Sequence, residues 1–134
     1  AALVDLDLDG RLDIVVVNRR ANAEILHNLT DDSGGWLQIA LRQDGGNRNA
    51  IGAWIEVRAG EELWRTEVVI GGGHASGQAG WNHFGLGGEC DAEIRVQWPD
   101  GSWSGWQEVG SNRFVTVKRD GPAVSVAFGP ASAY

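Results

Sequence analysis

The chain has 134 residues, a formal net charge of −7 and a pI near 4.8. This length fits one domain, or one small domain with an appendage, and the acidic balance argues against nucleic acid as a partner because phosphates would be repelled. No stretch approaches the ~20 apolar residues of a membrane span, and the single cysteine, Cys90, excludes an internal disulfide. Methionine is absent and Ala1 begins within an apolar run, so we expect the chain to be a processed piece of a longer protein, with any targeting signal already removed.

Short apolar or alternating segments bounded by Gly, Asn or Asp predict an all-β fold, because twenty glycines accompany almost no helical periodicity. In chain order we expect strands at 1–4, 13–18, 23–29, 36–42, 53–59, 62–70, 82–86, 92–98, 103–109 and 113–118, and an edge strand or loose tail at 123–128. Strands at roughly ten-residue spacing with glycine turns are typical of an antiparallel β-sandwich or barrel.

The polar segment 30–35 predicts a boundary within the chain. We therefore expect a small β fragment at 1–30, a sandwich-like β domain at 31–119, and a C-terminal strand or tail at 120–134.

The first segment contains the loop "DLDLDGRLD", in which aspartates recur at almost every second position. Like charges this close repel one another, and Ca²⁺ is a hard ion that takes six to eight oxygen ligands. Gly10 permits the sharp turn that such a loop needs. The expected ligands are the carboxylates of Asp5, Asp7, Asp9 and Asp13 and the main-chain carbonyl of Arg11.

Three other interpretations of this loop are an EF-hand, a Mg²⁺ site and an acidic turn without a metal. An EF-hand would carry Glu where Val16 stands, and it would continue into a helix rather than a strand. Mg²⁺ fits less well than Ca²⁺ because it prefers few protein ligands and ordered water. The remaining alternative is a solvated acidic turn without a metal.

The order of short motifs along the chain resembles two known families. "AALVDLDLDGRLDIVVVN…ILHN" resembles an FG-GAP or VCBS repeat, the calcium-loop blade of integrin-like β-propellers. "GNRNAIGAWIEV", "GGGHASGQ", "HFGLG", "IRVQWPDG" and "NRFVTVK" resemble the ASPIC/UnbV domain, which follows such repeats in the cartilage acidic protein-like family. The resemblance implies a fragment of a propeller blade before a β domain, and a mostly extracellular, calcium-binding protein without catalytic activity. It places His74 where the family motif has an aromatic residue, and Gly77 between the Ser and the Gln of that motif.

Seven tryptophans are candidates for packing or for binding. Those within expected strands fit core or cross-strand packing. Trp81, Trp103 and Trp106 lie in or beside glycine-rich segments, where exposed rings would stack on sugars or contact a protein partner. The histidines and Cys90 match no zinc-site spacing, and the sequence contains no GxSxG or HExxH catalytic motif.

These observations predict a non-catalytic, calcium-binding recognition or adhesion module that acts outside the cytoplasm, in an extracellular or periplasmic setting. Its partner would be a protein or glycan surface, and the strands of residues 1–29 offer a route to self-association. Two alternatives stay open: a carbohydrate-binding module that uses the exposed tryptophans, and an accessory domain of an exported enzyme whose active site lies upstream.

Overall fold

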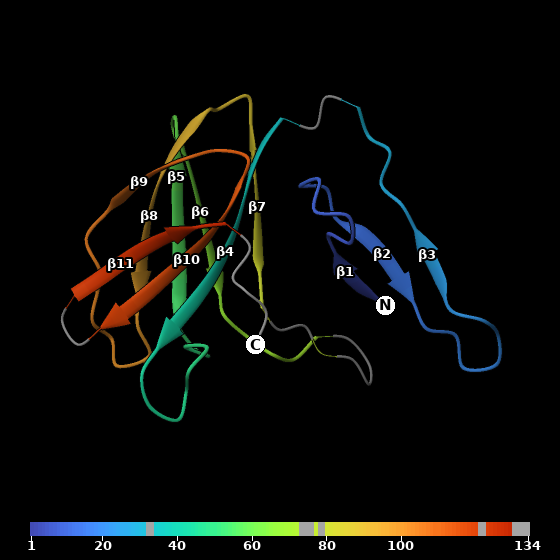
Figure 1. Cartoon of the computed structure of the whole chain (residues 1–134), viewed down its shortest axis with the longest axis horizontal. Coiled ribbons are helices and arrows are strands. Elements are labelled where there is room, and N and C mark those ends of the chain that lie inside the picture. The colour runs from blue at the N-terminus through green and yellow to red at the C-terminus, as the bar shows by residue number, and fades with distance from the viewer. Residues whose placement is uncertain (32–33, 73–76, 78–79, 121–122, 130–134) are drawn as a thin grey trace.

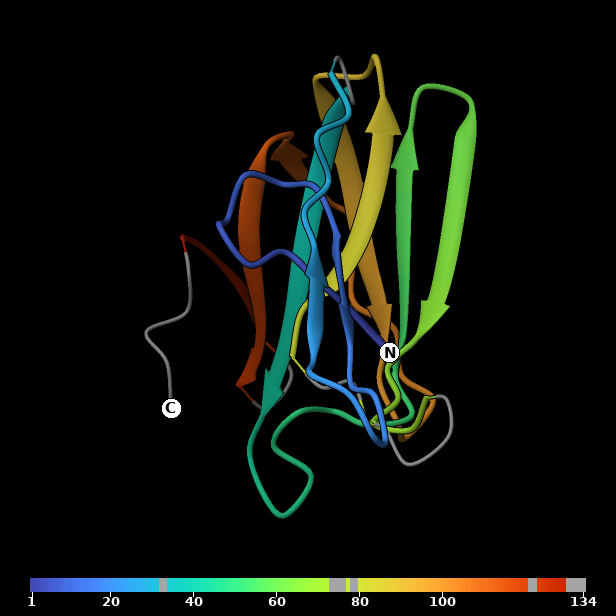
Figure 2. The ribbon, with the colours of Figure 1, turned by 90° about the vertical axis from the view of Figure 1, so that its right-hand side faces the viewer.

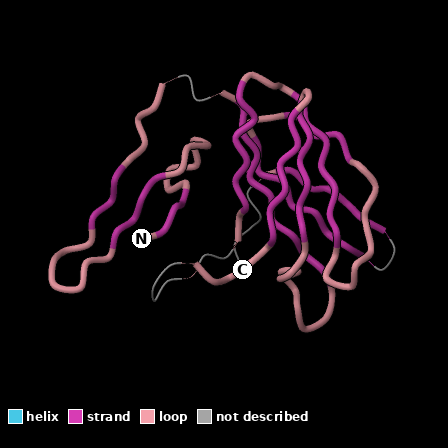
Figure 3. Tube along the Cα trace, turned by 180° about the vertical axis from the view of Figure 1, so that it is seen from behind, coloured by secondary structure: helices cyan, strands magenta, loops and turns pink. Residues whose placement is uncertain are grey.

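The computed structural model describes residues 1–31, 34–72, 77, 80–120 and 123–129. Within these residues all regular elements are strands (Figure 3), which confirms the predicted all-β fold. They are β1 (Ala2–Val4), β2 (Asp13–Val16), β3 (Glu24–Leu26), β4 (Gly35–Gln43), β5 (Trp54–Ala59), β6 (Glu62–Glu67), β7 (Asn82–Gly87), β8 (Asp91–Gln97), β9 (Gln107–Gly110), β10 (Arg113–Asp120) and β11 (Ala123–Phe128). The described part of the chain contains no helix with the length and apolar character needed to cross a membrane.

The N-terminal residues form a small antiparallel sheet in the order β1-β2-β3. The aspartate loop connects β1 to β2, and all three residues of β3 are exposed at the sheet edge. In Figure 1 this sheet lies beside β4 and β7, and Figure 2 shows it in front of these strands when viewed from that side. The aspartate loop and β1 face the rest of the protein, since Ala2, Leu3 and Asp5 line a cavity together with Trp81 and Phe114 of the sandwich.

Residues from Gly35 onward form a sandwich of two four-stranded sheets, ordered β11-β10-β4-β7 and β6-β5-β8-β9. The sandwich-like architecture was predicted, and most of its pairs are antiparallel as expected. The pair β10–β4 is parallel, which the hydrophobic pattern does not show. A short turn after β9 carries the chain to the other sheet, and there the Asn112 N–H donates to the Trp36 carbonyl at 2.7 Å, so β10 starts beside the start of β4.

Alternation along the strands builds the core between the two sheets. In β5, Ile55 and Val57 are fully buried while Arg58 is exposed, as expected for a strand with one buried face. The largest fully buried side chains are Leu37, Ile39, Leu41, Ile55, Val57, Ile94, Val96, Val115 and Val117. They come from β4, β5, β8 and β10, the two central strands of each sheet.

The predicted strand at 103–109 is wrong in its first half, because β9 begins only at Gln107. Trp103 forms a single isolated bridge with Gln97. Next to it the Ser104 hydroxyl accepts the N–H of Val96 at 2.9 Å, so a side chain replaces the main-chain partner that a continuous ladder would supply. The segment 123–128 forms the edge strand β11 on β10.

Candidate metal centre

Asp5 organises the aspartate loop from its first position. Its carboxylate is almost completely buried and accepts the N–H groups of Asp9 at 3.0 Å and of Gly10 at 2.9 Å. Gly10 has φ +90°, a conformation that is inexpensive only for glycine, and this allows the chain to turn back toward Asp5. The loop is therefore wrapped around one carboxylate.

Asp13 closes the loop where β2 begins. Its carboxylate accepts the N–H of Asn28 at 2.8 Å and the N–H of Leu6 at 3.2 Å. The hydrogen bond from Asn28 is the largest factor that lowers the pKa of Asp13 below its usual value of 3.8, although burial opposes it. Asp13 therefore favours the charged form and connects the loop to the chain that follows β3.

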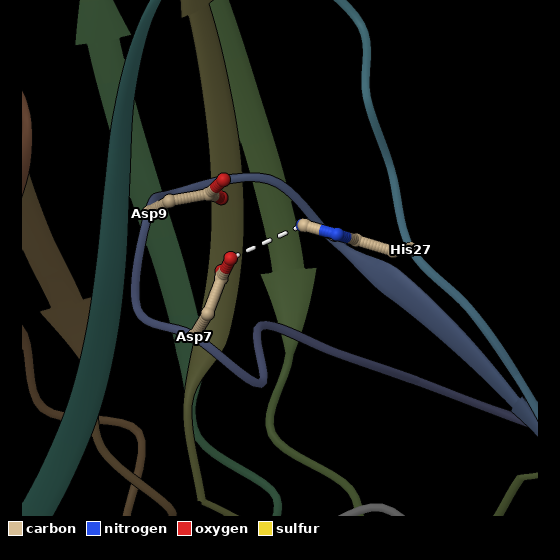
Figure 4. Close-up of side chains that lie close together, drawn as sticks. All are labelled: Asp7, Asp9 and His27. Atoms are coloured by element: carbon tan, nitrogen blue, oxygen red, sulfur yellow. Dashed lines mark ion pairs between the residues drawn. The ribbon is translucent and has the colours of Figure 1, made fainter.

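Asp7, Asp9 and His27 form the cluster of possible metal ligands (Figure 4). Each offers one donor atom, and these atoms lie within 4.8 Å of one another. The His27 Nε2 lies 3.1 Å from a carboxylate oxygen of Asp7. The side chains of Asp7 and His27 are about half exposed, so the cluster opens to solvent.

His27 was not among the expected ligands, although the hairpin register could have indicated it. Ile14 pairs with Leu26 across β2 and β3, so the next residue, His27, falls opposite Asp13 at the end of the loop. From the sequence, His27 was considered only for a zinc site, and its spacing from the other histidines and Cys90 matches no zinc motif.

The Arg11 side chain brings a positive charge to the loop aspartates. The Arg11 guanidinium forms an ion pair with Asp9 and also donates from Nε to the carbonyl of Asn28 at 2.9 Å. Arg11 offsets part of the repulsion that the loop sequence creates, and His27 occupies a carboxylate oxygen of Asp7. A metal ion would therefore compete with these two groups for the carboxylates.

The donor chemistry fits a divalent cation. Asp7 and Asp9 converge with their carboxylate oxygens, and Asp5 and Asp13 keep acceptor capacity because a carboxylate has about four lone-pair sites. The five expected ligands thus divide into two groups. Asp7 and Asp9 come together at the open cluster, while Asp5 and Asp13 shape the loop from within, and the Arg11 side chain pairs with Asp9.

The tryptophans of the "WSGW" segment lie on the outer face of the sheet β6-β5-β8-β9. There, indole rings alternate with guanidinium groups in the order Trp54, Arg65, Trp103, Arg95, Trp106, Arg58. The Arg95 guanidinium lies 4.4 Å from the ring centroids of both Trp103 and Trp106. Arginine therefore contacts the ring faces that a sugar would stack on, and this arrangement favours cation–π packing over sugar stacking.

Trp81 has a different environment. It packs edge-to-face on Phe114, with the ring centroids 5.0 Å apart. With His83 and Asp5 it lines a cavity of about 240 Å³ between the N-terminal segment and the sandwich. His74 lies outside the described residues.

An all-β sandwich that carries an aspartate-loop sheet on one side is thus the class of protein defined by this fold and site. The family model described as "ASPIC and UnbV" matches residues 43–123, more than half of the 134 residues. The chain belongs to the ASPIC and UnbV family. No curated protein shows significant similarity to the chain.

Proposed function

We propose that the protein is a non-catalytic recognition module that binds Ca²⁺ in the loop Asp5–Asp13. The observation that supports this most directly is the convergence of carboxylate oxygens from Asp7 and Asp9, within 4.8 Å of each other, on a loop wrapped around Asp5. Asp5, Asp7, Asp9, Asp13 and the Arg11 carbonyl would hold the ion. Bound Ca²⁺ would supply charge neutralisation and would stiffen the loop.

The affinity should be weak. Ca²⁺ prefers oxygen over the nitrogen of His27, and it must displace the ion pair between Arg11 and Asp9. We expect a dissociation constant on the order of 10⁻⁴ to 10⁻³ M, the range of extracellular calcium modules. This range is consistent with a secreted or periplasmic protein that takes part in adhesion, and fractionation of the source cells would test that location.

The three-stranded sheet β1-β2-β3, with the loop between its first two strands, also supports the interpretation of residues 1–30 as part of an FG-GAP or VCBS blade. Such a blade would place the protein close to the cartilage acidic protein-like family. Further "DxDxDG" repeats in the upstream reading frame would support this assignment, and their absence there would count against it.

Isothermal calorimetry tests calcium binding. Asp9→Asn keeps an oxygen that can accept the Arg11 N–H but removes a charge, so we expect it to weaken binding by more than about tenfold, the effect of ~1.4 kcal/mol. Asp44→Asn is the matched control, because Asp44 is an exposed aspartate in the turn after β4. No heat from the wild type at millimolar calcium, or equal heats from all three proteins, would contradict the proposal.

A further inference from the structure

A buried hydrogen bond attaches the aspartate loop to the sandwich. The Gln38 Nε2 donates to the Asp5 carboxylate at 2.6 Å, and both residues are almost completely buried, at 4% and 6% exposure. Gln38 belongs to β4, which pairs with strands on both sides. The group that holds Asp5 is therefore fixed by the sandwich.

The donor to Asp5 is the neutral amide of Gln38, so the hydrogen bond does not cancel the negative charge that a cation would need. Asp5 accepts one hydrogen bond from Gln38 and two from the loop main chain, which together offset the cost of burying a carboxylate. A lysine or arginine at position 38 would also hold Asp5 but would cancel its charge. Gln38 orients the carboxylate and leaves its negative charge available to a cation.

Trp36 makes the second contact from the same face of β4. A Cβ atom added to Gly10 would lie 2.0 Å from the Trp36 Nε1, so the indole ring rests directly on the loop glycine. The ring is supported by Phe114, with centroids 5.3 Å apart at an interplanar angle of 73°. Gln38 and Trp36 thus contact the two features that give the loop its shape, Asp5 and Gly10.

We propose that Gln38 and Trp36 are positioning residues of the calcium loop, so that the sandwich completes the metal site and calcium affinity depends on it. This inference rests on the proposed calcium function. Because linkage is reciprocal, calcium bound in the loop also stabilises the sandwich against unfolding. The loop and the ASPIC/UnbV domain then act as one calcium-dependent unit, although the family match itself begins only at residue 43.

The test compares Gln38→Met with Gln43→Met in the full chain. Met keeps most of the glutamine volume and removes the donor. Gln43 is the matched control, because it also lies in β4 and its amide donates, at 2.8 Å, to the carbonyl of Asn47, outside the calcium loop. Calorimetry gives the calcium affinity. Amide hydrogen exchange without calcium reports on Asp9 and Gly10, with Ile39 as the reporter of the folded sandwich.

We expect Gln38→Met to weaken calcium binding about tenfold, the effect of losing one hydrogen bond to a charged group. We also expect faster exchange at Asp9 and Gly10, with Ile39 still protected, and wild-type values for Gln43→Met. If Gln38→Met does not fold, Gln38→Asn gives the same comparison with a buried amide one methylene shorter.

The outcomes separate this inference from the proposed function. A folded Gln38 variant with wild-type calcium affinity overturns the positioning role and leaves calcium binding intact. A wild type that binds no calcium contradicts the proposed function, and the positioning role for calcium is lost with it. Exchange at Asp9 and Gly10 would then show only whether Gln38 orders the loop.

Discussion

Replacement of Gly10 by alanine tests the contact between the aspartate loop and the sandwich. Alanine at φ +90° costs about 1 kcal/mol in backbone strain. Its Cβ would also lie 2.0 Å from the Trp36 Nε1, and relieving such an overlap costs a further ~1–3 kcal/mol. We therefore expect Gly10→Ala to lower the free energy of unfolding by roughly 2–4 kcal/mol, the sum of these two terms.

The control for this experiment is Gly45→Ala. Gly45 has φ +92°, almost the same as Gly10, but no atom lies within 4 Å of its added Cβ. Gly45→Ala should therefore show the backbone cost alone. Urea unfolding followed by the fluorescence of the seven tryptophans measures the free energy of unfolding of both variants. Equal losses of stability in the two variants would refute the close packing of Trp36 on the loop.

Two further predictions concern buried charge and pH. Arg95→Ala removes the closest partner of the buried Glu56 carboxylate, at 2.7 Å, and should lower the free energy of unfolding by about 1–3 kcal/mol. Arg58→Ala breaks a more exposed ion pair and should lower it by less than ~1 kcal/mol in the same urea assay. Equal losses of stability in Arg95→Ala and Arg58→Ala would contradict the role of Arg95 as the partner of the buried Glu56. Burial lowers the pKa of His83 below 6.5, so the unfolded chain binds that proton more readily and stability falls as the pH drops below 6.5. In thermal melts between pH 5 and pH 8, His83→Gln should flatten this dependence, and an unchanged pH profile would show that other groups cause it.

The sequence pattern predicted most strands because their alternation is regular. Ile55 and Val57 alternate with polar residues, and the segment 123–128 forms a strand over the predicted span. The pattern failed at Trp103, where Ser104 binds Val96 through its hydroxyl. This hydrogen bond depends on which residue of β8 lies opposite Ser104. The alternation of apolar and polar residues within one segment does not show how two segments are paired.

The candidate metal site was predictable only in part, because some of its contacts come from residues far away in the sequence. Asp7 and Asp9 follow from spacing within one loop, since neighbours in sequence stay neighbours in space. Gln38 lies 33 residues from Asp5, and its role depends on how the N-terminal sheet docks on β4. The arginines around Trp103 and Trp106 likewise come from other strands, so their stacking requires the sheet register. Long-range polar contacts of this kind leave no local signal in the sequence.

The open edge of β3 leads to the last prediction, which concerns self-association. The loop docks on its own sandwich, yet all three β3 residues stay exposed, and Ile25 is 64% exposed. An exposed apolar edge strand offers unpaired N–H and C=O groups to another chain. We therefore expect two copies to pair through β3 at high concentration, as seen by sedimentation velocity.

Ile25→Lys should weaken this association strongly. Burying one isoleucine contributes about 1.5–3 kcal/mol, and a symmetric dimer loses this contribution twice, so the loss is about 100-fold or more. Folding should be spared because the side chain is exposed in the monomer. Leu63→Lys is the control, since Leu63 is 56% exposed on β6, an edge strand of the sandwich. A monomeric wild type at every concentration, or equal effects of the two lysines, would show that β3 is not the interface. If association is lost only in Ile25→Lys, the exposed apolar residues of the N-terminal sheet serve as a contact surface, and the same segment provides both the aspartate loop and the dimer edge.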